Sequence, residues 1–359
     1  MHLPNWLGDA IMTTPLIDFL AQAFAALPAN ERPTLHLAVR RPWSVLFADD
    51  PRIEDMLIID REQRHAGVGG IWRQAGDMKQ GHYDAIVLCP PSLRAGLAAA
   101  LAGISLRVGH ATDGRGLLLK PGLARGPRGN RHYSFEMLEL GLAVLESLQI
   151  PAPTLPEAGC PLPSLPGCAG VPAMTPGQEP VWVVAPGTTY GEAKTWPRER
   201  MSEFLALAHK NAGARVVLVG DQHVAAFVAE MRQASDLHWT SELDEAGDVV
   251  DLTGRTDLLQ VVQIMKSAAA FIGNDSGLMH LAGALGLPTV GIFGSSNPDW
   301  THPLGARTSA VVAEGFACRP CYRKTCNQAR FCLAEVAAET VLEQVQSLAA
   351  QSHAEGEGA

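Results

Sequence analysis

The clearest candidates for chemistry follow a short apolar stretch in the second half of the chain. Residues 269–272 predict a strand, positions 274–277 then read Asn-Asp-Ser-Gly, and apolar residues at helical spacing continue from there. A helix that begins directly after a strand presents unpaired N–H groups and the positive end of its dipole above the sheet. These groups favour an anionic ligand, and Gly277 lets such a ligand approach the backbone.

Four side chains beside this helix start add further binding chemistry. Asn274 to Ser276 supply N-cap chemistry, Ser276 also offers a hydroxyl group, and His280 lies one turn further on the same helix face. Asp275 repels phosphate, so we interpret it as an acceptor for ligand hydroxyl groups. Phosphate donors combined with a hydroxyl acceptor suit a sugar nucleotide. An ordinary capped helix, with His280 as a core histidine, is the alternative.

A second stretch of this kind follows another predicted strand. Residues 186–197 read Pro-Gly-Thr-Thr-Tyr-Gly-Glu-Ala-Lys-Thr-Trp-Pro, and Lys194 is the one cation among them. Since α/β proteins bind ligands beyond the carboxyl ends of their strands, Lys194 is a candidate diphosphate contact, with Thr188 and Thr189 as hydroxyl donors. A surface lysine is the alternative interpretation. Asp221, directly after the next predicted strand, is a further candidate for contacting a nucleotide sugar.

These blocks resemble those of a known enzyme family. Residues 274–280, Asn-Asp-Ser-Gly-Leu-Met-His, and residues 186–197 are similar to two blocks of the ADP-heptose:lipopolysaccharide heptosyltransferases, glycosyltransferase family 9, and occur in the same order. The resemblance implies that Lys194 contacts the diphosphate of the donor. It implies also that Asp275 orients the heptose while Ser276 and the helix amino terminus hold phosphate oxygens.

The amino terminus resembles a third block of the same family. Positions 4–9 read Pro-Asn-Trp-Leu-Gly-Asp, in which Gly8 gives the backbone room and Asp9 corresponds to the base that deprotonates the acceptor. A structural N-cap is the competing interpretation of Asp9. Only residues 1–3 precede this block, so we expect a truncated first strand, through a late start codon or trimming.

The resemblance implies an inverting transfer of heptose from ADP-heptose to the first heptose of the lipopolysaccharide inner core. The acceptor would be a phosphorylated Kdo-lipid A core at the cytoplasmic face of the inner membrane. The chain has no Asp-x-Asp motif of metal-dependent glycosyltransferases, so we expect no metal and no cofactor. Two alternatives stay open: a family 9 enzyme with another acceptor or sugar, and a non-catalytic nucleotide-binding protein of the same fold.

Alternating strand and helix patterns predict an α/β protein with parallel sheets. The resemblance implies the GT-B architecture, in which two Rossmann-like domains face each other across a cleft. We expect an acceptor-binding domain at 1–155, a linker at 156–180, a donor-binding domain at 181–335 and, at 336–359, a helix packing back toward the first domain, with a tail. The linker rests on composition, since residues 151–180 contain nine prolines and four glycines.

Composition excludes several classes of protein. A net charge of −9 argues against nucleic acid as partner, and no run of 18 apolar residues predicts a membrane span. The amino terminus lacks the features of a signal peptide, so we expect a cytoplasmic protein with peripheral membrane contact.

One segment, 94–132, inverts the charge balance and suggests loops that approach an anionic partner, with a solvated face as the alternative. Its cations are Arg94, Arg107, Arg115, Lys120, Arg125, Arg128 and Arg131.

Four of the seven cysteines cluster near the carboxyl terminus. Cys318, Cys321, Cys326 and Cys332 lie among arginines and a lysine, at spacings that match no standard zinc finger. A zinc ion or iron-sulfur cluster, reduced thiols in a basic loop, and disulfides all remain open for these residues.

Overall fold

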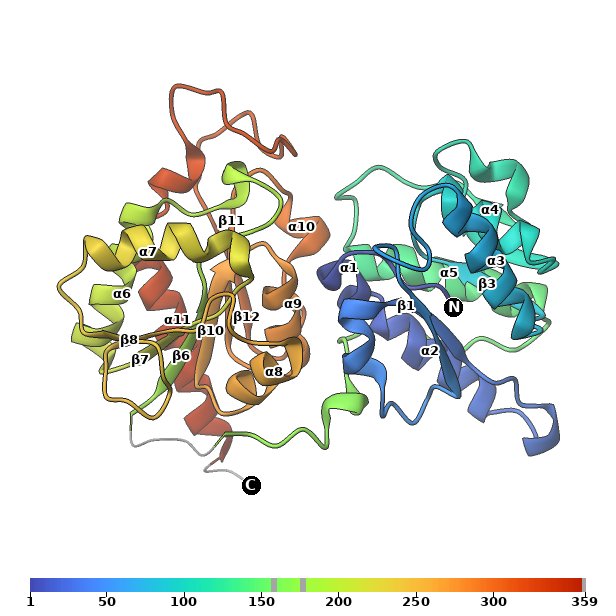
Figure 1. The fold of residues 1–359 in the computed structure, drawn as a ribbon, viewed down its shortest axis with the longest axis horizontal. Helices are drawn as coiled ribbons and strands as arrows, with labels where there is room; N and C mark the ends of the chain where they lie inside the picture. Colours follow the sequence, from blue (N-terminus) through green and yellow to red (C-terminus); the bar gives the residue numbers. More distant parts are fainter. Residues whose placement is uncertain (156–159, 175–178, 357–359) are drawn as a thin grey trace. The chain divides into compact units, whose positions relative to one another are not determined.

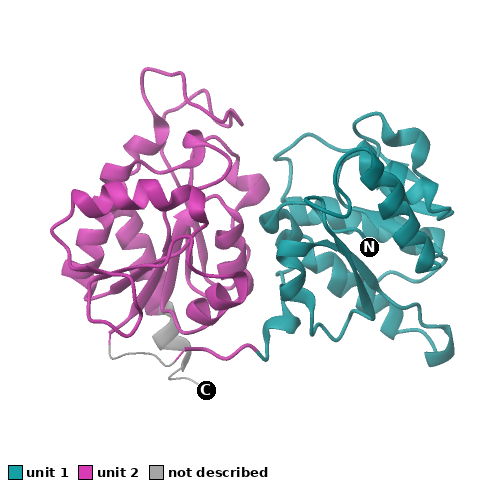
Figure 2. Cartoon of the chain, viewed as in Figure 1, with its two compact units in different colours: residues 1–170 teal, residues 171–359 magenta. Residues whose placement is uncertain are grey.

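The chain folds into two compact units. The computed structural model describes residues 1–155, 160–174 and 179–356, and the units are Met1–Gly170 and Val171–Ala359 (Figure 2). The boundary between the units falls inside the segment predicted as a linker. Residues 156–159 and 175–178 of that segment, and the last three residues of the predicted tail, lie outside the described residues.

Unit 1 contains two small parallel sheets. Strands β1 and β2 pair with His36 opposite Asp55, and the second sheet has the order β3-β4-β5. The strands are β1 His36–Arg40, β2 Asp55–Ile59, β3 Ala85–Leu88, β4 Leu106–His110 and β5 Gly122–Leu123. Residues 1–3 do not form a full strand, but His2 bridges in parallel to both Ala38 and Leu88 and so links the two sheets.

The helices of unit 1 bury apolar faces against these sheets. Helix α4 begins after Ser92, whose hydroxyl accepts a hydrogen bond from the amide of Ala95, a common N-cap arrangement. The helices are α1 Leu7–Met12, α2 Thr14–Ala25, α3 Gly69–Gln80, α4 Leu93–Leu101 and α5 Tyr133–Ser147. Helices α2 and α5 pack on each other, and so do α3 and α4.

Unit 2 is built on one seven-stranded sheet in which all pairs are parallel. The strand order is β12-β11-β10-β6-β7-β9-β8. The strands are β6 Val181–Ala185, β7 Arg215–Leu218, β8 Trp239–Thr240, β9 Val249–Asp251, β10 Ala270–Asn274, β11 Thr289–Phe293 and β12 Thr308–Val312. The buried residues of β6 and β10 are mostly Val, Ile, Ala and Phe, as expected for strands covered on both faces.

Helices cover both faces of this sheet. Figure 1 shows α6 and α11 on one side of the strands and α8 and α9 on the other. The helices are α6 Arg198–Ala212, α7 Ala225–Gln233, α8 Leu258–Lys266, α9 Gly277–Ala284, α10 Pro298–Thr301 and α11 Ala338–Gly356. Helix α8 starts with a capping box between Asp257 and Gln260, and α6 ends at Gly213 in the left-handed conformation. The prediction of an α/β protein with parallel sheets is confirmed.

The carboxyl-terminal helix packs within unit 2. Val341, Leu342, Val345 and Leu348 belong to its core, and α11 lies against α6 and the strands β10, β11 and β12. Its packing toward the first unit stays a prediction.

The arginine-rich segment 94–132 is more structural than its sequence suggested. Arg115 is fully buried and donates to the carbonyls of His110, Pro90 and Leu88, while Arg125 forms a 2.8 Å ion pair with Glu136. Arg94 and Arg107 also donate to backbone carbonyls, and Arg131 pairs with Glu139. The segment is not made of loops alone, because α4 and β4 form within it. The guanidinium of Arg115 is used by carbonyls at the ends of strands, so the interpretation as a loop that approaches an anion is wrong for Arg115.

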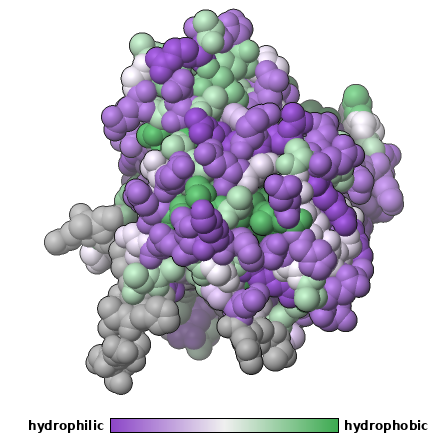
Figure 3. Space-filling model, turned by 90° about the vertical axis from the view of Figure 1, so that its left-hand side faces the viewer, coloured by the Kyte–Doolittle hydropathy of each residue, from purple (hydrophilic) through white to green (hydrophobic). Residues whose placement is uncertain are grey.

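The molecular face drawn in Figure 3 is mostly hydrophilic, with small apolar patches between the polar side chains. Within the described residues, no helix combines the length and apolar content that crossing a bilayer requires.

Candidate active site

The centre of the unit 2 sheet is a topological switch point. Strand β6 lies in the middle of the sheet, with β7, β9 and β8 next to it in this order on one side and β10, β11 and β12 on the other. Segments that follow β6 and β10 therefore leave the same sheet edge and diverge, which creates the crevice where α/β proteins bind ligands. The two blocks predicted from sequence, 186–197 and 274–280, are the segments that follow these two strands.

An ion pair joins the two blocks. The ammonium group of Lys194 lies 2.5 Å from Oδ2 of Asp275, and the hydroxyl of Ser296 donates to the same oxygen at 2.5 Å. The side chains of Lys194 and Asp275 are 17% and 5% exposed, so water screens this contact weakly. Ser296, which sequence reasoning missed, follows β11. It could have been found by the same rule, because β11 and β10 are parallel neighbours whose ends share one edge.

A buried asparagine fixes the segment that carries Lys194. Asn274, at the end of β10, accepts from the amide of Trp196 at 2.7 Å and donates to the carbonyl of Pro186 at 3.0 Å. Its side chain thus clamps both ends of the 186–197 segment. The indole of Trp196 is fully buried and donates to the carbonyl of Val336, which ties the segment to the core.

The tip of the 186–197 segment is held from the other side by the cysteine-containing loop. The ring of Tyr190 lies under the ammonium of Lys194, 4.8 Å from its centroid, and its hydroxyl donates to the carbonyl of Tyr322 at 2.6 Å. Gly191 has φ +145°, and a Cβ there would lie 2.5 Å from the carbonyl oxygen of Lys324. Glycine is thus required where the two loops touch, and Lys194 is positioned by both of them.

Several buried polar atoms around Asp275 have no hydrogen-bond partner among the described residues. They are Ser276 Oγ, Ser295 Oγ and His280 Nδ1. Leaving such atoms unpaired is costly unless a ligand or water completes them. Ser276 and His280 follow Asp275 in the chain and Ser295 directly precedes Ser296, so this edge of the sheet is a polar site suited to a hydroxyl-rich or phosphorylated ligand.

His280 is a buried, neutral neighbour of Asp275. Burial lowers the pKa of His280 to about 4, although the charge of Asp275 acts in the opposite direction. Its Nε2 lies 4.0 Å from Oδ1 of Asp275, too far for a hydrogen bond. The structure therefore places His280 beside the site as an uncharged support.

The start of α9 differs in detail from the predicted cap. Ser276 occupies the N-cap position, but its side chain makes no capping hydrogen bond, and Gly277 is the first helical residue. Ser276 is therefore the N-cap residue, within the expected range 274–276, but the expected side-chain capping bond is absent, and the Asn274 amide and the Asp275 carboxylate are engaged by the 186–197 segment and Ser296. The first N–H groups of α9 thus receive no cap from the Ser276 hydroxyl.

The remaining donor-side candidates lie apart from this pair. Thr188 accepts from the amide of Tyr190 and lines a cavity of about 580 Å³, together with His223. Thr189 is exposed. Asp221 is exposed and accepts from the amide of His223, so it caps the short helix that follows β7. The structure brings Lys194, Asp275 and Ser276 together and leaves Thr188, Thr189 and Asp221 on adjoining loops.

The amino-terminal candidates lie in unit 1. Gly8 is buried and Asp9 is half-buried in the first turn of α1, whose N-cap is Trp6. The interpretation of Asp9 as the N-cap is therefore wrong. Burial raises the pKa of Tyr133 well above its usual value, and the negative charge of Asp9 raises it further, so a neutral phenol lies within electrostatic reach of Asp9.

The clustered cysteines are all free thiols in the structure. Cys318, Cys321, Cys326 and Cys332 line one cavity of about 330 Å³, and burial raises the pKa of the Cys332 thiol. No three His, Cys, Asp or Glu side chains of the described residues are arranged to hold a metal ion.

Replacing Asn274 by leucine is expected to destabilise the protein by about 2–4 kcal/mol, because the Trp196 amide and the Pro186 carbonyl would be buried without partners. Urea unfolding followed by circular dichroism measures this change. Asn211→Ala, at an exposed position of α6, is the matched control and should stay within about 0.5 kcal/mol of the parent. Equal stabilities of the Asn274→Leu variant and the parent would contradict the clamp.

Comparison with known proteins identifies the family. The family model described as glycosyltransferase family 9 (heptosyltransferase) matches residues 71–332. Lipopolysaccharide heptosyltransferase 2 of Escherichia coli K12 is 26% identical over 319 residues, which cover 86% of each chain. Lipooligosaccharide heptosyltransferase 2 of Haemophilus influenzae is also 26% identical, with the same coverage.

Solved structures show the same fold. The structure of E. coli ADP-heptose lps heptosyltransferase II matches with a TM-score of 0.70 at 21% identity and covers 98% of each chain. A family 9 glycosyltransferase from Veillonella parvula matches with a TM-score of 0.73 at 18% identity, covering 98% of this chain and 96% of that one. The fold is of the GT-B class, as predicted. Since the family model spans most of the sequence, the chain belongs to glycosyltransferase family 9, the heptosyltransferases, and is a glycosyltransferase.

Proposed function

We propose that the protein transfers heptose from ADP-heptose to the first heptose of the lipopolysaccharide inner core. The relatives named above are lipopolysaccharide and lipooligosaccharide heptosyltransferases of type 2, and they align over most of the chain. The observation in the structure that carries the proposal is the Lys194–Asp275 pair at the switch point, next to Ser276, whose buried hydroxyl has no partner among the described residues.

In the proposed donor site, positive potential meets the diphosphate. Lys194 and the first N–H groups of α9 would take up the negative charge that develops on the departing ADP. Asp275 then has two tasks, because its carboxylate positions the Lys194 ammonium and its remaining lone pairs accept sugar hydroxyls. Gly277 lets the phosphate approach the backbone, and Ser276 offers its unpaired hydroxyl. Protein groups would thus supply the positive charge in a metal-independent transfer.

The neighbouring loops would hold the rest of the donor. Thr188 and Thr189 follow β6 and Asp221 follows β7, so all three lie beyond the carboxyl ends of adjacent strands. We assign them to contacts with the nucleotide or its sugar.

The proposed chemical step is a single displacement with inversion. Asp9 removes the proton of the acceptor hydroxyl, the oxygen attacks the anomeric carbon, and the bond from that carbon to the diphosphate oxygen breaks. The electron pair leaves with ADP, and the proton passes from Asp9 to solvent. Gly8, directly before this carboxylate in the chain, is buried. The site of the reaction would be the cytoplasmic face of the inner membrane, where the protein binds peripherally.

Two other functions are distinguishable by experiment. A family 9 enzyme with another acceptor would keep the donor site and differ in unit 1, whereas one with another sugar would differ at the donor site itself. A non-catalytic nucleotide-binding protein would bind ADP through unit 2 without turnover.

The deciding measurement is ADP release from ADP-heptose with two acceptors. We expect release with Kdo-lipid A that carries one heptose and none with Kdo-lipid A that carries no heptose. Release with the heptose-free acceptor would assign the enzyme to an earlier transfer. Absence of release with either, while ADP still binds, would contradict the proposed function.

A further inference from the structure

Within residues 1–21, all of which the structure describes, Trp6 is the one exposed residue. It is 64% exposed, whereas the residues that follow it, Leu7, Gly8 and Asp9, are buried or half-buried. Tryptophan is highly buried on average in folded proteins, because its ring has a large apolar area. This segment thus buries its smaller apolar side chains and exposes its largest one, an arrangement that suits contact with a ligand better than it suits folding.

The backbone on both sides of Trp6 is held in place. The indole N–H of Trp43 donates to the carbonyl of Asn5 at 3.0 Å, and the carbonyl of Trp6 accepts from the amide of Ala10 at 2.9 Å. Trp6 itself has the extended conformation of an N-cap residue, with φ −97° and ψ 143°. The exposed ring therefore projects from a fixed backbone, so that binding a ligand would require little further ordering of the chain.

Trp6 and Asp9 share the first turn of α1. They occupy the N-cap and N3 positions, whose residues lie close enough to bond to each other in a capping box. Residues three apart on a helix lie on the same face, with Cβ atoms about 5–6 Å from each other. A sugar whose hydroxyl group meets the Asp9 carboxylate would thus have its ring within reach of the indole of Trp6.

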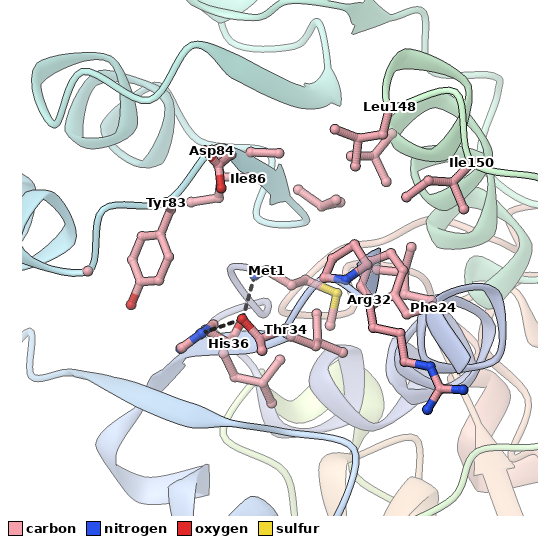
Figure 4. A pocket seen from close by; sticks show the side chains of 18 of the residues that line it. Met1, Phe24, Arg32, Thr34, His36, Tyr83, Asp84, Ile86, Leu148 and Ile150 are labelled. Carbon is pink, nitrogen blue, oxygen red and sulfur yellow. Dashed lines mark hydrogen bonds between the residues drawn. The ribbon is translucent and has the colours of Figure 1, made fainter. Parts of the chain in front are cut away.

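The cavity of about 720 Å³ in unit 1 does not include this pair. Figure 4 shows Phe24 and Leu148 on its walls, and none of the residues of α1, all of which the structure describes, lines it. This cavity borders the first residues of β1 and β3. His2 bridges in parallel to both strands, so the chain that follows leads to Trp6 beyond their carboxyl ends. Since α/β proteins bind ligands at that edge, a sugar would meet Asp9 beside Trp6 and not in the cavity.

We propose that Trp6 is a stacking platform for the acceptor, in which the indole face packs against the C–H face of the heptose whose hydroxyl group Asp9 deprotonates. This inference rests on the proposed function, in which Asp9 is the base. The face of an indole carries partial negative charge and attracts the C–H groups of a sugar ring, while the contact removes water from both surfaces. Such a contact holds the acceptor equally in the ground state and the transition state, so Trp6 sets acceptor affinity and not the rate of the chemical step.

The test compares Trp6→Ala, Trp6→Leu and Trp6→Phe in the full chain. The acceptor is Kdo-lipid A with one heptose, from which the acyl chains have been removed, so that only its sugars and phosphates can contact the indole. We expect Trp6→Ala and Trp6→Leu to raise both the KM and the calorimetric dissociation constant of this acceptor by about tenfold or more. The kcat should change by less than about threefold. Trp6→Phe keeps an aromatic face, so its acceptor affinity should stay within about threefold of the parent's.

Two controls separate contact with the acceptor from a structural role. Because Trp6 is exposed, all three variants should unfold within about 2 °C of the parent and bind ADP within about twofold of it. The matched variant Trp72→Ala removes another exposed tryptophan of unit 1, on α3, and should leave acceptor affinity and kcat unchanged.

Three outcomes would overturn the inference alone, while ADP release by the parent with the acylated acceptor still supports the proposed function. They are unchanged acceptor affinity in Trp6→Ala, a fall in kcat without a rise in KM, and no binding of the deacylated acceptor by the parent. A parent that neither binds nor glycosylates the acylated acceptor would overturn the proposed function and this inference with it.

Discussion

Replacing Lys194 by methionine is expected to lower kcat/KM for glycosyl transfer by about 10- to 150-fold. This factor corresponds to the loss of one charge-assisted contact of about 1.5–3 kcal/mol with the departing diphosphate. Methionine keeps an unbranched apolar side chain against the ring of Tyr190 and removes the charge, so the loss isolates electrostatics. Steady-state measurement of ADP release at several donor concentrations gives the change in kcat and in KM separately.

The same substitution leaves Asp275 without its cation, so stability needs a separate control. An unpaired carboxylate that is 5% exposed is expected to cost up to about 3–5 kcal/mol of unfolding free energy. In the double variant Lys194→Met/Asp275→Asn, much of this stability should return, because no charge remains buried. Turnover should stay low. Recovery of kcat/KM along with stability would show that Lys194 acts through folding. The control variant Lys210→Met, at an exposed site of α6, should change neither kcat/KM nor stability.

The strands and helices of unit 2 could be predicted because their signals are local. The stretch from β10 through α9 to β11 has continuous apolar strands and a helical repeat of apolar residues followed by Gly286, and the strand predicted at 269–272 is observed as β10 at Ala270–Asn274. Strand β4 was not predicted, because the charged Arg107 within it suggests an exposed position. The guanidinium of Arg107 donates to the carbonyl of Leu118, a contact between segments that no local pattern reveals.

The same distinction separates what could be foreseen at the site. Residue types at strand ends indicated Lys194 and Asp275, since parallel strands place their carboxyl ends along one edge. Their direct pairing could not be read from sequence, because it requires β6 and β10 to be neighbours, and strand order depends on long-range packing. Ser296 and Asn274 were missed as partners for this reason.

Replacing Asp9 by asparagine is expected to lower kcat by about 10²- to 10⁴-fold, the usual effect of removing a general base. Asparagine matches the shape of aspartate and cannot accept the proton of the acceptor hydroxyl. The Asp9 carboxylate lies in the first turn of α1, near the positive end of the helix dipole. The neutral phenol of Tyr133 adds no competing charge.

The donor affinity of the Asp9→Asn variant tests the division of labour between the units. Asp9 belongs to unit 1, whereas Lys194 and Asp275 belong to unit 2. Calorimetry should therefore find that the ADP affinity of the variant is within about twofold of the parent's, a change in binding free energy below about 0.4 kcal/mol. Asp49→Asn, at an exposed position of unit 1, is the control and should retain full turnover. Full turnover in the Asp9 variant would assign the base to another residue. A loss of ADP affinity equal to the loss of kcat would instead make Asp9 part of the donor site, since a base acts on the acceptor and leaves donor binding unchanged.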